Sequence, residues 1–193
     1  LSKSYGAFKV TDEIAIDLNF DEIHALIGPN GAGKTTLFNV ISGIYEPDEG
    51  SLFFEENDLT QVPSRKRIKK GLSRSFQNIR LMPHLSVLEN VMLGQHSRFG
   101  ITDLLKPLNF LTESTGKIEA TETLKRFRID LYEGRTVSSL PYGVRKKIEV
   151  VRALMANPRL LMLDEPAAGL NTEETDELRR FLNEVSDSGI TLL

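Results

Sequence analysis

The chain has 193 residues, 40% hydrophobic and 26% charged, a balance typical of a compact domain with a sizeable core and a solvated surface. The formal net charge of -3 gives no general reason to expect nucleic-acid binding, and the absence of cysteine excludes a disulfide framework and thiolate metal sites. No apolar run approaches the roughly 18 residues that a membrane span needs, and no signal-peptide pattern opens the chain, so we expect a soluble protein.

The first fifty or so residues predict short strands separated by turns. Phe8–Phe20 alternates roughly between apolar and polar residues, as a half-buried antiparallel strand does. Ile23–Ile27 is a continuous apolar run, typical of a strand buried on both faces. A glycine-rich stretch follows it, and apolar residues at 37, 40 and 41 then have helical spacing. Ser51–Phe54 predicts another strand after a turn.

The rest of the chain predicts helices and then a second strand–helix unit. The basic run Arg65–Lys70 is interpreted as the solvated face of a helix. Leu85 to about Thr136 has helical patterns without a strong strand. A strand and turn follow within Arg159–Asn171, and a helix over Thr172–Gly189 should open on a threonine cap and close on glycine. Ile190–Leu193 begins another apolar strand.

Strands followed by helices at both ends indicate an α/β fold with a parallel sheet. We expect one domain over residues 1–193, with an N-terminal antiparallel β subdomain and a helical subdomain inserted at approximately 78–140.

The segment "GPNGAGKT" has the spacing G-x-x-x-x-G-K-[ST] at Gly28, Gly33, Lys34 and Thr35. Glycines here allow backbone angles that a Cβ forbids, so that consecutive N–H groups turn inward around an anion at the positive end of a helix. The lysine can reach the β- and γ-phosphates of a nucleotide, and the Thr35 hydroxyl can ligate Mg²⁺. The predicted phosphate-binding residues, called the phosphate loop below, are Gly28, Pro29, Asn30, Gly31, Ala32, Gly33, Lys34, Thr35 and Thr36. The motif lies between a predicted strand and a helix, which favours a P-loop NTPase core over a ligand-free turn.

Two carboxylates end the apolar run Leu160–Glu165. At the C-terminal edge of a parallel sheet, Asp164 should face the Mg²⁺ held by Thr35, and Glu165 the position of an attacking water. Alone, Asp-Glu-Pro is also compatible with an ordinary turn.

A third segment, "LPYGV", places Pro141, Tyr142 and Gly143 before a helix whose first turn carries Arg145–Lys147. Cations at a helix N-terminus oppose the macrodipole by roughly 0.3–1 kcal/mol. The sequence therefore either tolerates a local cost or awaits an anion from outside.

With these three segments in order, the chain resembles the nucleotide-binding subunit of ATP-binding cassette (ABC) transporters over nearly all of its length. The resemblance implies that Tyr5 stacks on adenine and that Gln77 links the metal site to the helical subdomain. It identifies Pro141–Gly143 with the family signature and Ala168–Asn171 with the loop after the second carboxylate. Taken alone, Tyr5 and Gln77 are also compatible with an ordinary surface aromatic and a polar loop residue.

The resemblance also implies an ATPase with ATP and Mg²⁺ as cofactors, in which Glu165, Lys34 and Gln77 are catalytic and Thr35, Gln77 and Asp164 serve the metal. It implies a homo- or heterodimer in which two such subunits pack head to tail, so that the helix starting after Gly143 points at a γ-phosphate on the partner. Integral membrane permeases and, indirectly, a solute-binding protein are the other implied partners, with no nucleic acid. The expected location is cytoplasmic, on the inner face of the cell membrane, and the basic residues after the signature are expected to be solvated.

The signature departs from the commoner pattern, because Pro141 replaces a serine and Val144 a frequent glutamine. Pro-Tyr-Gly is familiar in one branch, the ATPases of branched-chain amino-acid importers. The family's switch histidine follows the next strand, and His24, His84 and His96 do not lie there, so the chain is expected to be truncated before it. Two alternatives stay open: a soluble cassette ATPase that acts on DNA, ribosomes or a regulator, and a nucleotide-binding fragment with little turnover.

Overall fold

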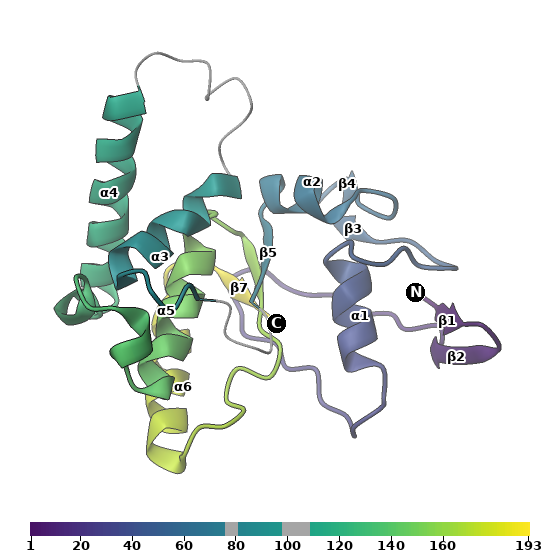
Figure 1. Cartoon of the computed structure of the whole chain (residues 1–193). Helices are drawn as coiled ribbons and strands as arrows, with labels where there is room; N and C mark the ends of the chain where they lie inside the picture. The colour runs from purple at the N-terminus through teal and green to yellow at the C-terminus, as the bar shows by residue number, and fades with distance from the viewer. Residues whose placement is uncertain (76–80, 98–108) are drawn as a thin grey trace.

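A parallel sheet runs through the middle of the molecule, between a group of helices on one side and α1 with two hairpins on the other (Figure 1). The computed structural model describes residues 1–75, 81–97 and 109–193, and for 97 and 109–114 the backbone alone. Within these ranges the sheet has the order β5-β6-β7. Its strands are β5 (Leu72–Arg74), β6 (Leu160–Met162) and β7 (Thr191–Leu192), and both neighbouring pairs are parallel.

The helices on one side of the sheet share a core with β6 and β7. They are α3 (Val87–Leu93), α4 (Asn109–Arg126), α5 (Tyr142–Leu154) and α6 (Thr172–Ser186), with the 3₁₀ turns η1 (Gly94–Ser97), η2 (Asp130–Tyr132) and η3 (Val137–Ser139). Val91, Leu124 and Ile148 are buried from three different helices, and Leu161 of β6 joins the same cluster. The apolar stripes of the helices therefore pack against one face of the sheet.

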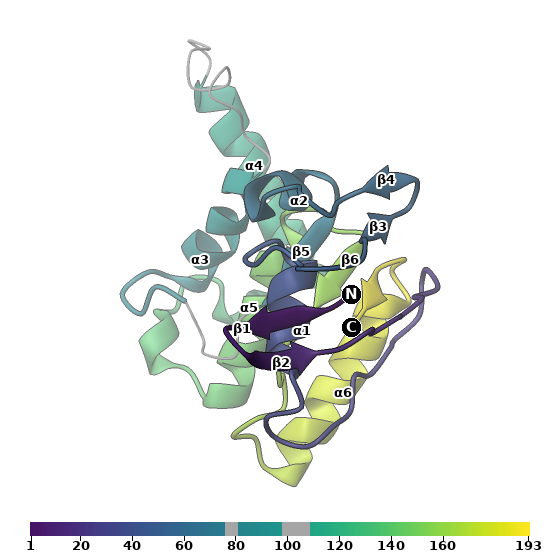
Figure 2. The same ribbon diagram turned by 90° about the vertical axis from the view of Figure 1, so that its right-hand side faces the viewer.

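The other side of the sheet is covered by α1 (Lys34–Ile41), whose Leu37, Phe38 and Ile41 pack against β5 and β6. The remaining elements here are α2 (Ser64–Lys69) and the antiparallel hairpins β1 (Lys3–Tyr5) with β2 (Phe8–Thr11) and β3 (Phe53–Phe54) with β4 (Asn57–Asp58). Figure 2 shows the β1–β2 hairpin in front of α1. The predicted α/β fold with a parallel sheet, N-terminal antiparallel strands and an intervening run of helices is confirmed.

Two predicted strands are shorter than expected. The segment 8–20 forms a strand only at Phe8–Thr11, because Glu13 takes a left-handed φ of 46° that breaks the extended backbone. Of the segment 23–27, only Ile23 pairs with β7, through a parallel bridge to Leu192. Residues 24–27 form no strand, and Ile23 and Ile27 are 49% and 90% exposed rather than buried. The expectation of a strand buried on both faces was wrong.

The boundaries of two helices also differ from the prediction. The N-cap of α6 is Asn171 rather than Thr172; its side chain accepts from the Glu174 N–H and the Glu174 carboxylate accepts from the Asn171 N–H, which is a capping box. The helix ends at Ser186, and Gly189 follows with a φ of 86°. Helix α5 begins at Tyr142, one residue before Gly143, because proline at 141 suits the extended backbone just before a helix.

The basic run Arg65–Lys70 is only partly solvated. Arg67 is 1% exposed, and its guanidinium donates to the carbonyl oxygens of Thr60, Val62, Val40 and Ile41. Since the last two carbonyls end α1, the buried cation caps the negative end of that helix. The interpretation as a solvated helix face was wrong for this residue.

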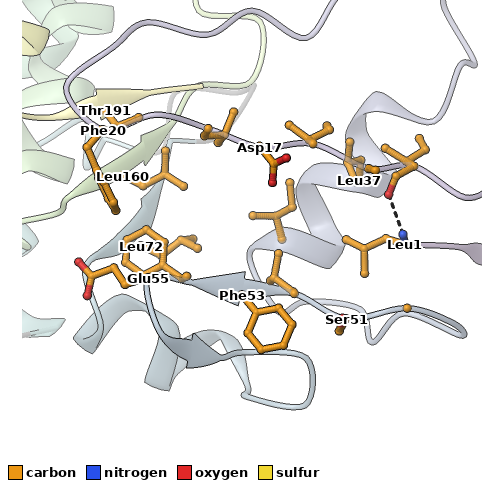
Figure 3. A pocket seen from close by; sticks show the side chains of 18 residues that line it. Leu1, Asp17, Phe20, Leu37, Ser51, Phe53, Glu55, Leu72, Leu160 and Thr191 are labelled. Carbon is orange, nitrogen blue, oxygen red and sulfur yellow. Dashed lines mark hydrogen bonds between the residues drawn. The ribbon is translucent and has the colours of Figure 1, made fainter.

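A cavity of about 660 Å³ lies between the segment 14–20, α1 and the β3 region (Figure 3). Its lining is mostly apolar, and the ammonium group of Leu1 donates to the Ile14 carbonyl at 2.7 Å beside it. Of the predicted site residues that the structure describes, none lines this cavity. The described site residues that the sequence predicts therefore lie outside this cavity.

Candidate functional site

The N-terminus of α1 has the features expected of an anion site. Its N-cap is Gly33 at a φ of 84°, and among the described residues no side chain caps the helix and no acidic residue lies in its first turn. A Cβ at Gly33 would lie 2.7 Å from the carbonyl oxygen of Val10, so only glycine allows β2 to approach this closely. The first N–H groups of a helix have no partner inside it, so this end can donate hydrogen bonds to an anion.

Lys34 folds its side chain back over the phosphate loop. The ammonium group donates to the carbonyl oxygens of Gly28 at 2.6 Å and Pro29 at 2.9 Å. The positive charge thus lies within the loop, next to the uncapped helix start. Both features favour a bound phosphate.

Asp164 is buried two residues beyond β6 and is ion-paired. Its Oδ2 accepts from the Nη2 of Arg74 at 2.7 Å, and the Nη1 of the same guanidinium donates to the Oδ1 of Asn39 at 2.6 Å. Arg74 ends β5, which lies beside β6 in the sheet. The predicted metal ligand is therefore connected to α1 through an arginine that the sequence reasoning missed.

Thr35 and Asn39 lie one helical turn apart on α1, so they share a face of the helix. Asn39 contacts Arg74, which in turn contacts Asp164. The face of α1 that carries the Thr35 hydroxyl is therefore directed toward the Asp164 side of the sheet. The two residues predicted to serve a metal come from elements that the structure brings together.

Glu165 is exposed and takes a φ of 49°, a left-handed conformation that few non-glycine residues adopt. Such backbone geometry costs of order 1–3 kcal/mol and is concentrated at functional sites. The residue follows Asp164 directly, beyond the buried end of β6.

The predicted signature begins a helix that is also uncapped. Pro141 is the N-cap of α5, and the described residues supply neither a capping side chain nor an acidic residue in the first turn. By contrast, α3 and α6 both begin with complete capping boxes. The short helix α2, which starts outside this region, is uncapped as well.

Two close contacts join the signature to the segment after Glu165. A Cβ at Gly143 would lie 3.1 Å from the Oε1 of Glu174, and a Cβ at Gly169 would lie 3.4 Å from the ring of Tyr142. Glycine at each position allows the start of α5 to lie against the loop and the first turn of α6. The family signature and the loop after the carboxylates therefore touch within one chain.

The cations of the first turn of α5 have partners of their own. The Arg145 guanidinium and the Lys146 ammonium lie 5.5 and 5.7 Å from the centroid of the Tyr142 ring. Lys147 pairs with Glu177 of α6 at 2.7 Å, and this contact lowers the pKa of the glutamate. Lys146 is 4% exposed, so the expectation that all three are solvated was wrong. The ring and the glutamate offset the unfavourable position of these charges, each by about 0.5–1 kcal/mol.

Two further residues were predicted to belong to the site, Tyr5 and Gln77. Tyr5 ends β1, is 46% exposed and makes an edge-to-face contact with Tyr45, with 5.8 Å between the ring centroids. Gln77 lies outside the described residues.

A family model described as "ABC transporter" matches residues 11–168 of the chain. The chain belongs to this family. As an ABC ATPase, it is an ATP-binding and ATP-hydrolysing transporter subunit, and the enzymatic activity predicted from its motifs is confirmed.

Relatives and solved structures extend the match to the whole chain. The high-affinity branched-chain amino acid transport ATP-binding protein BraF of Pseudomonas aeruginosa is 33% identical, over 100% of this chain and 78% of its own length. LivG of Escherichia coli, which carries the same description, is 35% identical over 96% of this chain and 74% of its own. A crystal structure of the ADP conformation of an ATP-binding cassette has a TM-score of 0.86 and 32% identity, covering 100% of this chain and 76% of that one.

ABC ATPases with other named cargoes match this chain at comparable identity. The sulfate/thiosulfate import protein CysA of Bacillus cereus is 37% identical over 97% of this chain and 50% of its own length. The lipopolysaccharide export protein LptB of Escherichia coli is 31% identical over 100% and 76%. Sequence identity therefore shows that the chain is an ABC ATPase, but it does not distinguish between the solutes named for these relatives.

Proposed function

We propose that this ABC ATPase energises the uptake of branched-chain amino acids by hydrolysing Mg·ATP. The nucleotide part of the proposal is carried by one observation, the uncapped start of α1 in a glycine-rich loop that also holds the Lys34 ammonium. The phosphate loop donates its backbone N–H groups to the phosphates, and Tyr5 stacks on the adenine. The solute part is supported by the matches to BraF and LivG, which cover 100% and 96% of this chain, and by the Pro141-Tyr142-Gly143 signature.

The residues at this site suit Mg²⁺. Magnesium prefers oxygen ligands and is held by one or two carboxylates together with substrate phosphates. The structure offers the Thr35 hydroxyl and the Asp164 carboxylate on facing elements, while no cluster of three His, Cys, Asp or Glu residues occurs among the described side chains. We propose that Thr35 and Asp164 hold the metal with Gln77, and that most remaining ligands come from the nucleotide. The bound ion would neutralise charge on the phosphates.

The chain's own residues then divide the work of hydrolysis. The exposed Glu165 carboxylate accepts a hydrogen bond from the attacking water and orients it toward the γ-phosphate. The Lys34 ammonium leaves its loop carbonyls for the phosphate oxygens, where it stabilises developing negative charge. We propose that Gln77 links the metal site to the helices within approximately 78–140, and that these helices act as an inserted subdomain.

The start of α5 acts on a second nucleotide. We propose that two ABC ATPase subunits pack head to tail, so that the uncapped N-terminus at Pro141–Gly143 binds the γ-phosphate held by the partner. Helix N–H groups without a capping side chain support this role, because an anion from outside satisfies them. Arg145 and Lys146 stay on the Tyr142 ring.

Within the described part of the chain, no helix is long and apolar enough to cross a membrane. We also propose integral membrane permeases as partners, with the ATPase on the inner face of the cell membrane and a solute-binding protein that delivers the amino acid.

Purification from native membranes, followed by reconstitution, tests this function. A tagged chain should co-purify with two integral membrane proteins, and proteoliposomes containing the complex and its solute-binding protein should take up radiolabelled leucine, isoleucine or valine when ATP is supplied. Lys34→Ala should abolish uptake and ATP binding together. Uptake of sulfate instead would contradict the proposed solute. Co-purification with ribosomes or DNA only would contradict the transport role. Either result would leave the ATPase activity intact.

A further inference from the structure

We propose that Arg74 is a positioning residue, which holds Asp164 in place for Mg²⁺ by tying this carboxylate to the phosphate-loop helix α1. The inference rests on the proposed function, in which Asp164 serves the metal. It adds an outer layer to the site: a residue that touches neither nucleotide nor metal and fixes the group that does.

The guanidinium of Arg74 contacts two elements at once. Nη2 donates to Asp164 Oδ2 at 2.7 Å, and Nη1 donates to Asn39 Oδ1 at 2.6 Å and, more weakly, to Ser42 Oγ at 3.3 Å. Because the guanidinium is planar and rigid, holding Nη1 on α1 also fixes the direction of Nη2. The position of Asp164 thereby depends on α1, the helix that begins at the phosphate loop.

The arginine is itself held firmly. Its guanidinium lies 5.6 Å from the centroid of the Phe38 ring, also on α1. It ends β5, whose register places Arg74 beside Met162 of β6, two residues before Asp164. Because the sheet fixes the Arg74 backbone and α1 fixes its guanidinium, the distance between α1 and Asp164 has little freedom to change.

A purely structural role does not account for this ion pair. The side chains of Arg74 and Asp164 are 8% and 10% exposed, so both charges have lost most of their water. Replacing such a pair with apolar residues is often neutral or stabilising, because the desolvation cost rivals the Coulombic gain. A buried charge pair at the proposed metal site is more simply explained by the need for a carboxylate in one defined orientation.

The contacts leave Asp164 able to serve a cation. Within the described residues, Arg74 occupies Oδ2, and Oδ1 has no hydrogen-bond partner. One oxygen is thus anchored and the other remains for the metal or its water. Partners that orient metal ligands in this way typically account for a factor of 10–100 in metal affinity or activity.

The test separates metal affinity from nucleotide affinity. Mn²⁺ binding to the chain saturated with a non-hydrolysable ATP analogue is followed by electron paramagnetic resonance, and binding of the analogue alone is measured in EDTA. Arg74→Gln should weaken Mn²⁺ binding about tenfold with nucleotide binding in EDTA unchanged. Arg74→Lys should fall between Arg74→Gln and the parent, because lysine keeps the charge and cannot span both partners. Arg159→Gln, which removes an exposed arginine paired with Glu55, is the matched control and should change neither.

A double-mutant cycle tests the bridge to α1. Asn39→Ala leaves the Arg74–Asp164 pair intact and should still weaken Mn²⁺ binding. Its effect should be less than additive with that of Arg74→Gln, since both break the same connection. If Arg74→Gln does not fold, Asn39→Ala alone decides the matter.

Three results would overturn the inference. Unchanged Mn²⁺ affinity in Arg74→Gln, or in Asn39→Ala, would show that the bridge does not position the carboxylate. Parallel loss of nucleotide binding in EDTA would show a structural role only. Unchanged Mn²⁺ affinity in Asp164→Asn would show that this carboxylate does not serve the metal, and would overturn that part of the proposed function as well.

Discussion

Tyr5 stands at the end of β1 with its ring edge against Tyr45, and directly across the hairpin from Phe8. Both Tyr5 and Phe8 are exposed aromatic residues, yet only the tyrosine is proposed to stack on adenine. Aromatic stacking on a base is worth about 1–3 kcal/mol, so the role has a measurable consequence.

Tyr5→Ala should weaken ATP binding by about 1 kcal/mol or more, roughly fivefold, because the adenine loses its stacking partner. Ribose triphosphate, which has no base, should bind the parent and the variant equally in a fluorescence competition titration. Phe8→Ala removes a more exposed ring from the neighbouring strand and should leave both affinities unchanged. Equal loss for both ligands in Tyr5→Ala would argue against stacking.

At the residue scale, the sequence predicted those parts of the site whose chemistry is local. The phosphate loop could be read directly, because its glycines, Lys34 and Thr35 are neighbours in the chain. Arg74 could not be assigned to Asp164, because the two come from strands that become neighbours only in the folded sheet. A cation at the end of a predicted strand, in "LSRSF", was the one available signal.

Helix α1 is held at both of its ends, by different means. The phosphate loop leads into its N-terminus. At the C-terminus, the buried Arg67 guanidinium donates to the Val40 and Ile41 carbonyls, and it pairs with no carboxylate in the described contacts. Gly43 makes room for this arrangement, because a Cβ there would lie 2.7 Å from the Arg67 Nε. Burial lowers the pKa of the guanidinium, which remains protonated at any physiological pH.

Arg67→Met should lower the free energy of unfolding by about 3 kcal/mol, because four carbonyls lose a charged donor. For a domain of this size the melting temperature should fall by roughly 6–12 °C. Lys66→Met, on the exposed side of the same helix, is the control and should change stability by less than about 0.5 kcal/mol. Thermal melts of the two variants that coincide would contradict the capping role.

At the scale of elements, helices were easier to predict than strands. The apolar spacing at Leu37, Val40 and Ile41 is local to α1, and the structure buries all three. The extent of a strand depends on its neighbour in the sheet. The segment 23–27 therefore looked like a buried strand, although only Ile23 meets β7.

For the molecule as a whole, the uncapped starts of α1 and α5 belong to different sides of the sheet. A single nucleotide on α1 satisfies only one of them. The head-to-tail dimer that we propose satisfies both, because each α5 then receives the γ-phosphate bound by the other subunit.

Glu165→Gln should bind ATP normally and fail to hydrolyse it, since the amide keeps the shape of the carboxylate and lacks its charge. A dimer bound to ATP should then accumulate. Light scattering with ATP and Mg²⁺ should detect a species of twice the 21.7 kDa monomer mass in the variant, and only transiently in the parent. Near-normal turnover in the variant would contradict the role of Glu165 and leave the nucleotide site standing.

The alternation of strands and helices predicted the α/β class and the parallel sheet, but not the strand order. The order β5-β6-β7 places two strands side by side whose residues 72 and 160 are partners. To predict this pairing, one must know that the chain leaves the sheet after β5, forms the intervening helices and returns beside β5. No local sequence pattern encodes that return.

That pairing also determines when β5 can join the sheet during synthesis on the ribosome. Leu72 of β5 cannot pair until Leu160 of β6, which lies 88 positions later, has been synthesised. At about 5–20 residues per second, synthesis takes roughly 4–18 seconds to provide the partner strand. During this interval the edge of β5 remains unpaired and open to strands of other chains, whereas α3 and α4 need only local contacts to form. Slower synthesis lengthens the exposure, so the yield of folded protein should depend on translation speed between these two strands.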